Sequence, residues 1–250
     1  MTSNVKYDLE DFSKVFTIVI GSDKDERRVK VSVALLSAQS FYFKGACAEK
    51  WLGVDKILEF PHERPETFEI FTAWLNAGDI KHASSLQKTE ESDDDQTRAR
   101  KLSKRWKQLL NCYIMADYIQ APKYMNTIMN ALVATLKDFE GQPTETNELA
   151  PLCDSCAETI DIIWDKTLVR SPLRKLVLDT LNSTRHAPWF MAQIHYFDNS
   201  NPPDGPNLTV PQEFILEFLE QSLRKLQTHD YNGFPWYQDH DFYHVMEKLP

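Results

Sequence analysis

Two short runs near the amino terminus alternate between hydrophobic and polar residues, as the strands of a half-buried sheet do. The first run lies at 16–20 and the second at 29–33, with a polar stretch at 21–28 between them. This pattern predicts a strand pair joined by an exposed turn. A third short strand is expected at 56–61, where Pro61 closes an apolar run.

Helical spacing of apolar residues dominates the rest of the first half. One helix is expected at 35–47. Another should begin at Pro65, whose missing N–H costs little in a first turn, and should end at Gly78. Residues 82–105 contain an acidic run followed by a basic one, which predicts a flexible, charged surface loop. Two consecutive helices follow, with a break at 121–122.

The polar segment 141–147, which contains Gly and Pro, is the predicted domain boundary. Beyond it, apolar residues keep helical spacing at 149–164 and again on one amphipathic face at 215–226. Between these stretches, Ser171 stands as an N-cap before Pro172, which suits the first turn of a further helix. The chain beyond the boundary is therefore expected to be helical throughout.

Composition and charge reduce the number of functions that this chain could have. The 250 residues exceed one ordinary domain, and their 42% hydrophobic share is enough for a sizeable core. The formal net charge of −9 disfavours nucleic acids and anionic membranes as partners. The basic run at 98–107 is a candidate nuclear-import signal or nucleic-acid contact, although its acidic neighbour favours a solvated loop.

Neither a membrane-spanning run nor a secretory signal is recognisable, and four cysteines are too few for a disulfide framework. The expected location is cytoplasmic or nuclear. With seven glycines, the chain has no phosphate-binding loop and no nucleophile elbow of the GxSxG type. We therefore expect no cofactor and no catalytic residue.

Two residue pairs have spacings that metal sites use. Cys153 and Cys156 stand one helical turn apart, but both continue an apolar stripe, which favours core packing. His240 and His244 are four apart, as in zinc proteases, but Asp241 stands where that motif needs a glutamate base. We expect no metal, and a zinc-dependent enzyme or a nucleic-acid-associated regulator are alternatives of lower rank.

Several segments carry loose motifs whose order along the chain is informative. The first half opens with a strand at 16–21, followed at 31–43 by a helix that contains a leucine pair, a serine and then aromatic residues. A phenylalanine-rich helix follows at 65–75, and a helix that ends in Ala-Asp-Tyr follows at 109–118. Together these segments resemble the BTB/POZ family of protein-interaction domains. The later region 160–179 is similar to the carboxy-terminal part of filamentous-fungal BTB proteins.

This resemblance implies an α+β fold with two parts. The first is a BTB/POZ-type domain at 13–140, a small sheet with surrounding helices. The second is an α-helical carboxy-terminal region at 147–250. The implied function is that of a protein-protein interaction module, an adaptor or scaffold rather than an enzyme. Its partners would be other proteins. A homodimer is possible but not required by the resemblance, because few residues precede the first strand.

The resemblance also brings an alternative, a substrate adaptor of a cullin-RING ubiquitin ligase. Family members that bind the cullin scaffold often carry a hydrophobic residue, any residue and glutamate after the second helix. Here Trp51, Leu52 and Gly53 stand at that place. Gly53 lacks the carboxylate, and losing one charge-assisted contact costs roughly 1 to 3 kcal/mol. These three residues and Tyr118 are the predicted protein-binding residues, with Trp51 foremost because it is a large aromatic in a connection.

Overall fold

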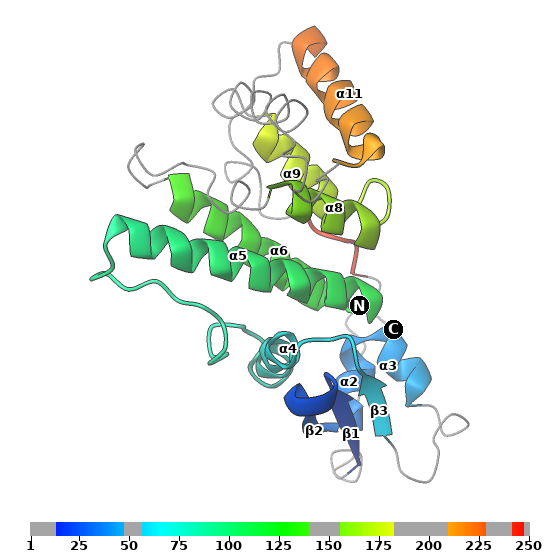
Figure 1. The fold of residues 1–250 in the computed structure, drawn as a ribbon. Coiled ribbons are helices and arrows are strands. Elements are labelled where there is room, and N and C mark those ends of the chain that lie inside the picture. The colour runs from blue at the N-terminus through cyan, green and yellow to red at the C-terminus, as the bar shows by residue number, and fades with distance from the viewer. Residues whose placement is uncertain (1–13, 48–56, 141–155, 183–209, 229–241, 248–250) are drawn as a thin grey trace. The chain divides into compact units, whose positions relative to one another are not determined.

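The computed structural model contains one small sheet, and most of its other elements are helices (Figure 1). It describes residues 14–47, 57–140, 156–182, 210–228 and 242–247. Within these ranges there are three strands and eight α-helices, so the mixed α+β class expected from the sequence is confirmed.

The chain divides into two compact units. Unit 1 comprises 1–88, 107–131 and 245–250, and unit 2 comprises 89–106 and 132–244. The boundary predicted at 141–147 falls outside the described residues.

The sheet of unit 1 has the strand order β2-β1-β3. Strand β1 (Val15–Ile20) pairs antiparallel with β2 (Arg27–Ser32), with Phe16 opposite Val31, as the alternating pattern predicted. Strand β3 (Ile57–Phe60) lies parallel to β1 on its other side. Because β1 is central, its apolar residues are the most buried, which is why its alternation gives way to a nearly continuous apolar run.

The prediction of a single helix at 35–47 is wrong in one respect, because the structure has two helices there. Helix α2 (Val33–Gln39) ends at Ser40, whose backbone is extended, with φ −143° and ψ 129°. Helix α3 (Phe41–Ala46) then begins, and the Ser40 hydroxyl accepts a hydrogen bond of 3.1 Å from the Phe43 N–H. Ser40 is therefore the N-cap of α3 and turns the chain between the two helices.

Helix α4 (Pro65–Ala77) begins and ends as predicted. Pro65 lies in its first turn, and Gly78 closes it in the left-handed conformation, with φ 72°. Its apolar face contributes three rings to a buried aromatic core. Neighbouring rings in this core have centroids 4.9 to 6.1 Å apart, and its members are Phe43, Phe60, Phe68, Phe71, Trp74 and Tyr124.

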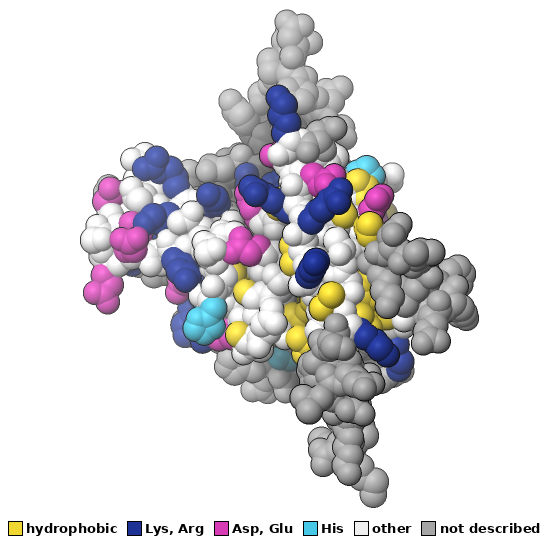
Figure 2. Space-filling model, turned by 90° about the horizontal axis from the view of Figure 1, so that it is seen from below, with side chains coloured by type: hydrophobic (Ala, Val, Ile, Leu, Met, Phe, Trp, Pro, Cys, Tyr) yellow, Lys and Arg dark blue, Asp and Glu magenta, His cyan; other side chains and the backbone are white. Residues whose placement is uncertain are grey.

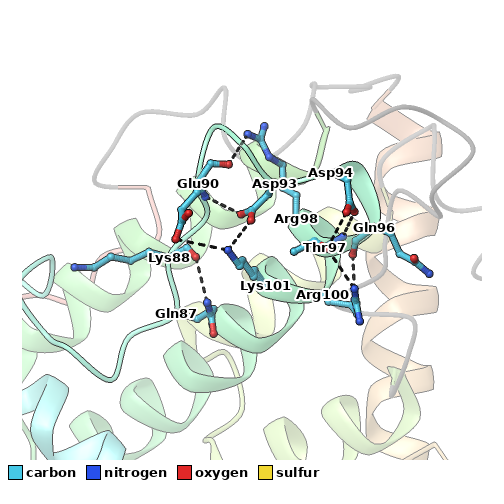
Figure 3. Close-up of polar contacts among 10 residues, drawn as sticks. All are labelled: Gln87, Lys88, Glu90, Asp93, Asp94, Gln96, Thr97, Arg98, Arg100 and Lys101. Carbon is cyan, nitrogen blue, oxygen red and sulfur yellow. Dashed lines mark hydrogen bonds and ion pairs between the residues drawn. The ribbon is translucent and has the colours of Figure 1, made fainter.

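Helix α5 (Asp95–Tyr118) begins much earlier than expected, so the charged loop predicted for 82–105 is wrong over its second half. The acidic run supplies the reason. The Asp94 carboxylate accepts hydrogen bonds from the Thr97 N–H at 2.7 Å and from the Thr97 hydroxyl at 3.1 Å (Figure 3). Asp94 is thus an N-cap, and the Thr97 N–H lowers the pKa of its carboxyl group.

The acidic and basic runs also pair with each other. The Lys101 ammonium lies 2.6 Å from the Asp93 carboxylate and 4.0 Å from that of Glu90 (Figure 3). The Arg98 guanidinium donates to the Glu90 carbonyl at 3.2 Å. The acidic residues before the helix thus bind basic side chains of its first two turns, so a sequence that looks like a solvated loop leads into a helix. Helix α6 (Pro122–Glu140) follows after the predicted break.

Unit 2 contains three further helices at the places where apolar spacing predicted them. They are α8 (Cys156–Lys166), α9 (Pro172–Leu181) and α11 (Gln212–Thr228). Ser171 caps α9 as expected, accepting a hydrogen bond of 3.2 Å from the Leu173 N–H. In the core of this unit, the rings of Trp164 and Phe214 meet edge to face at 4.8 Å.

Arg174 is the polar centre of unit 2, with 3% of its side chain exposed. Its guanidinium donates to the Thr167 hydroxyl at 3.1 Å, to the Thr167 carbonyl at 2.6 Å and to the Trp164 carbonyl at 2.7 Å. It also lies 3.0 Å from the Glu217 carboxylate and 3.1 Å from that of Glu213. One side chain on α9 therefore holds both the end of α8 and the first turns of α11.

Candidate functional site

The four predicted binding residues have different outcomes. Trp51, Leu52 and Gly53 lie outside the described residues. Tyr118 is the last residue of α5 and is 60% exposed.

A short set of hydrogen bonds fixes the backbone beside Tyr118. Past the end of α5, Gln120 takes the left-handed conformation, with φ 52°. The carbonyl of Gln120 accepts from the Phe41 N–H at 3.2 Å, and that of Ile119 accepts from the Tyr42 N–H at 3.4 Å. The buried Ser40 hydroxyl donates to the Ile119 carbonyl at 2.5 Å. The unpaired N–H groups that begin α3 thus meet the carbonyl groups that follow α5, and the two helix dipoles attract.

Three aromatic rings come together at this junction, and we call them the Tyr118 surface: Tyr42, Phe60 and Tyr118. The Tyr118 ring lies 5.5 Å from the Tyr42 ring and 6.5 Å from the Phe60 ring, which it meets edge to face. Tyr42 and Phe60 are 5.9 Å apart. The rings belong to α3, β3 and the end of α5, which lie close together in Figure 1.

Burial and exposure are graded across the Tyr118 surface. Phe60 is 5% exposed and joins the aromatic core, Tyr42 is half-buried, and Tyr118 reaches solvent. Burial raises the pKa of Tyr42, and the neighbouring Tyr118 adds to this effect through its charge and a hydrogen bond. The surface therefore offers apolar ring faces together with hydroxyl groups that can hydrogen-bond.

Strand β3 is an edge of the three-stranded sheet described here. Its alternate residues Ile57 and Glu59 are exposed, and Phe60 at its end belongs to the Tyr118 surface. An edge strand offers backbone N–H and carbonyl groups to an extended peptide. Aromatic anchors and a strand edge therefore lie next to each other in unit 1.

The described part of the chain contains no cluster of side chains that would suit the alternative function, a zinc-dependent enzyme. There, no group of three or more His, Cys, Asp or Glu side chains is arranged to hold a metal ion. Cys153 and His240 lie outside the described residues, whereas Cys156 begins α8 and His244 is half-buried. Cys112 is fully buried, and burial raises the pKa of its thiol to about 12, which leaves it a poor nucleophile.

No helix among the described segments is long and apolar enough to cross a membrane.

The face of the molecule in Figure 2 shows hydrophobic side chains that reach the surface between charged ones. Tyr42 belongs to the site although it was not among the predicted binding residues. The aromatic run at 41–43 was the available signal, but a run of rings gives no indication of which ring faces solvent.

A scan against models of protein families, a search of curated proteins and a search of solved structures found no match to this chain. The likeness to the BTB/POZ family therefore stays a prediction from the sequence motifs.

Proposed function

We infer that this chain is a non-catalytic protein-interaction module, an adaptor or scaffold, that binds a partner protein through the Tyr118 surface of unit 1. The observation on which this proposal depends is the exposed Tyr118 ring, which lies against the rings of Tyr42 and Phe60. Tyrosine is enriched among the residues that dominate binding energy, because it offers a large amphipathic contact with few rotatable bonds.

Preorganisation supports the same proposal. The Ser40 hydroxyl bond to Ile119 and the backbone bonds from Phe41 and Tyr42 hold the start of α3 against the end of α5. A partner would therefore meet rings that are already positioned, and less side-chain entropy would be lost on binding. The exposed β3 edge is a place where an extended segment of that partner could add a strand.

The order of elements in unit 1 is compatible with the BTB/POZ resemblance. Two strands, a helix pair, a third strand and a further helix precede α5 and α6. A BTB/POZ-type domain would supply the binding surface, and the helical second half would select or position another client. This finer assignment is part of the proposal and depends on the motifs in the sequence.

The test is quantitative affinity purification from cell extract with three forms of the full chain. Wild type is compared with Tyr118→Ala and with Leu168→Ala, a matched control because Leu168 is 79% exposed and belongs to unit 2. Partners that use the Tyr118 surface should be recovered with wild type and the control and be depleted about tenfold or more with Tyr118→Ala. Equal recovery of every partner by all three forms would refute the proposed site.

The cullin-RING adaptor is the second candidate, favoured by Trp51 at the place where that subgroup carries a hydrophobic contact residue. It requires direct binding of a cullin amino-terminal domain to the purified chain. Titration calorimetry should show binding that Trp51→Ala weakens, whereas Gly53→Glu should strengthen it by restoring the missing carboxylate. Absence of binding at high micromolar concentration would remove this candidate and leave the general interaction module intact.

A further inference from the structure

Polar side chains connect α11 with α9 in unit 2. The sequence predicted an apolar core face at 215–226, which is wrong for residues such as Leu219, because its side chain is 45% exposed. The side-chain amide of Gln221 donates a hydrogen bond to the Asp179 carboxylate, and the Lys225 ammonium lies 3.7 Å from the same carboxylate. Both contacts are made to the Oδ1 atom. Asp179 is thus oriented from α11, while its Oδ2 atom is turned to a different donor.

That donor is Tyr243, which forms part of a short segment outside the helices. The Tyr243 hydroxyl donates to the Asp179 Oδ2 atom at 2.9 Å, and the tyrosine is 3% exposed. Burial raises the pKa of Tyr243 and the Asp179 charge raises it further, so the hydroxyl keeps its proton and acts as the donor.

The neighbouring residue Phe242 is held by a cation. The Lys175 ammonium lies 3.5 Å from the centroid of the Phe242 ring and 5.6 Å from that of Tyr243. The two rings meet edge to face at 4.9 Å. Lys175 and Asp179 are one helical turn apart on α9. A cation and an acceptor on one helix therefore hold two consecutive aromatic side chains. We call the four residues that surround them the Phe-Tyr site: Lys175, Asp179, Gln221 and Lys225.

The segment is attached as a short peptide ligand is, through a few side chains. Residues 242–247 contain neither helix nor strand, and Tyr243 is the buried residue among them. Phe242 and Met246 are 44% and 87% exposed. Within unit 1, the Asn126 side chain holds the Val245 backbone by hydrogen bonds of 2.8 and 3.1 Å, an attachment separate from the Phe-Tyr site. One buried anchor and one ring contact are typical of the recognition of short segments.

Each position of the site selects a kind of side chain. Asp179 is 16% exposed, so phenylalanine in place of the tyrosine would leave a largely buried carboxylate oxygen without its donor. An aliphatic residue in place of Phe242 would lose the attraction of the Lys175 charge to the ring face. The chemistry of the site therefore fits an aromatic residue directly followed by tyrosine.

We propose that the Phe-Tyr site of unit 2 is a docking site for an extended segment of a partner protein in which an aromatic residue is followed by tyrosine. Phe242 and Tyr243 occupy the site as a built-in ligand, which the partner's segment displaces. Because the built-in pair is tethered, it competes at an effective concentration in about the millimolar range. The site is separate from the Tyr118 surface of unit 1, and its test does not depend on that surface.

Binding of a short peptide to the full chain tests the site. The host is Tyr243→Ala, which removes the built-in anchor, and the probe is a fluorescent peptide of residues 241–244, Asp-Phe-Tyr-His. Fluorescence polarisation should give a dissociation constant on the order of 100 µM. A peptide with phenylalanine in place of tyrosine should bind about tenfold more weakly, because the carboxylate loses its donor. Wild type should also bind the original peptide about tenfold more weakly, because the tethered pair competes.

Two further variants in the Tyr243→Ala host locate the binding. Asp179→Asn should weaken binding of the peptide by about fivefold or more, because the acceptor is no longer charged. Asp165→Asn is the matched control, since Asp165 is an acid of unit 2 whose side chain is 62% exposed, and it should leave binding unchanged. Equal effects of the two substitutions would overturn the assignment of the site.

Other results would also overturn the proposal. They are an absence of binding to Tyr243→Ala up to about 500 µM, and equal binding of the tyrosine and phenylalanine peptides. A third is loss of the helical circular dichroism signal in Tyr243→Ala, because a ligand that can leave must not be required for the fold.

Fluorine NMR of the full wild-type chain labelled with 3-fluorotyrosine tests displacement directly. The Tyr243 signal is assigned by its absence from Tyr243→Phe, which keeps the ring and loses only the hydroxyl. Unlabelled peptide at about 5 mM should move this signal to the position of a solvent-exposed tyrosine. A Tyr243 signal that stays in place would show that the pair is a fixed part of unit 2, and the proposal would be wrong.

Discussion

Arg174→Met is the sharpest test of how unit 2 is held together. Methionine keeps an unbranched apolar stem of similar length but removes the guanidinium and its hydrogen bonds. The Trp164 and Thr167 carbonyl groups, which accept from Arg174 at 2.7 and 2.6 Å, would lose this donor. Glu217, with 21% of its side chain exposed, would lose a buried cation at 3.0 Å.

The magnitude follows from these losses. Removing one partner of a buried ion pair destabilises a protein by about 3 to 5 kcal/mol, because the remaining polar groups stay buried without compensation. Arg174 is 3% exposed, so water has little access to replace it. Arg174→Lys keeps the charge but loses the planar fork, and we expect about half of that effect, about 2 kcal/mol.

Urea denaturation followed by far-ultraviolet circular dichroism measures this change. The control is Arg170→Met, the same substitution at an exposed position whose φ of 64° is equally unfavourable for both side chains. It should change the free energy of unfolding by less than about 0.5 kcal/mol. If Arg174→Met costs no more than Arg170→Met, the guanidinium does not hold the three helices, and the account of unit 2 is wrong.

Three further predictions concern unit 1 and the start of α5. Ser40→Ala should destabilise the fold by about 2 kcal/mol in urea titrations, because it removes the α3 cap and a donor to the Ile119 carbonyl; no change would mean that backbone bonds suffice. The lowered pKa of Asp94 means that its stabilisation of α5 is complete above its ordinary value of 3.8 and is lost as pH falls further. The protection factor of the Thr97 amide, its exchange rate relative to that of an unstructured chain at the same pH, should therefore fall below pH 3.8, and Asp94→Asn, which keeps the cap, should remove that acid sensitivity. Cys112, with a pKa of about 12, should react with maleimide only after denaturation, as mass spectrometry would report; native labelling would show that the site opens.

Local signals determined most of the elements from the sequence alone. Alternation at 16–20 and 29–33 is enough to specify a strand pair, because side chains of a strand point to opposite faces in turn. Pro65 and Gly78 bound α4, and Ser171 caps α9, because each of these residues acts on backbone groups within a few positions. The mixed α+β class follows from these elements.

The errors arose where one local pattern allows two structures. The charged run before 105 has the composition of a solvated loop, yet the same acidic side chains cap a helix and pair with the bases that follow. Ser40 interrupts a helical pattern because its hydroxyl binds Ile119, a partner 79 positions away. Periodicity contains no information about such partners.

Only the tertiary structure decided which faces are buried and which residues form a site. Tyr118 was recognisable as a candidate, but its ring contact with Tyr42 depends on the junction of α3 with α5. Helix α11 has apolar residues on two sides, and contact with Trp164 selects Phe214 and leaves Leu219 outside. Arg174 is buried only because acceptors from α8 and α11 converge on it. The sequence determines local conformation through neighbours a few residues apart, whereas burial is decided by the segments that the fold brings together.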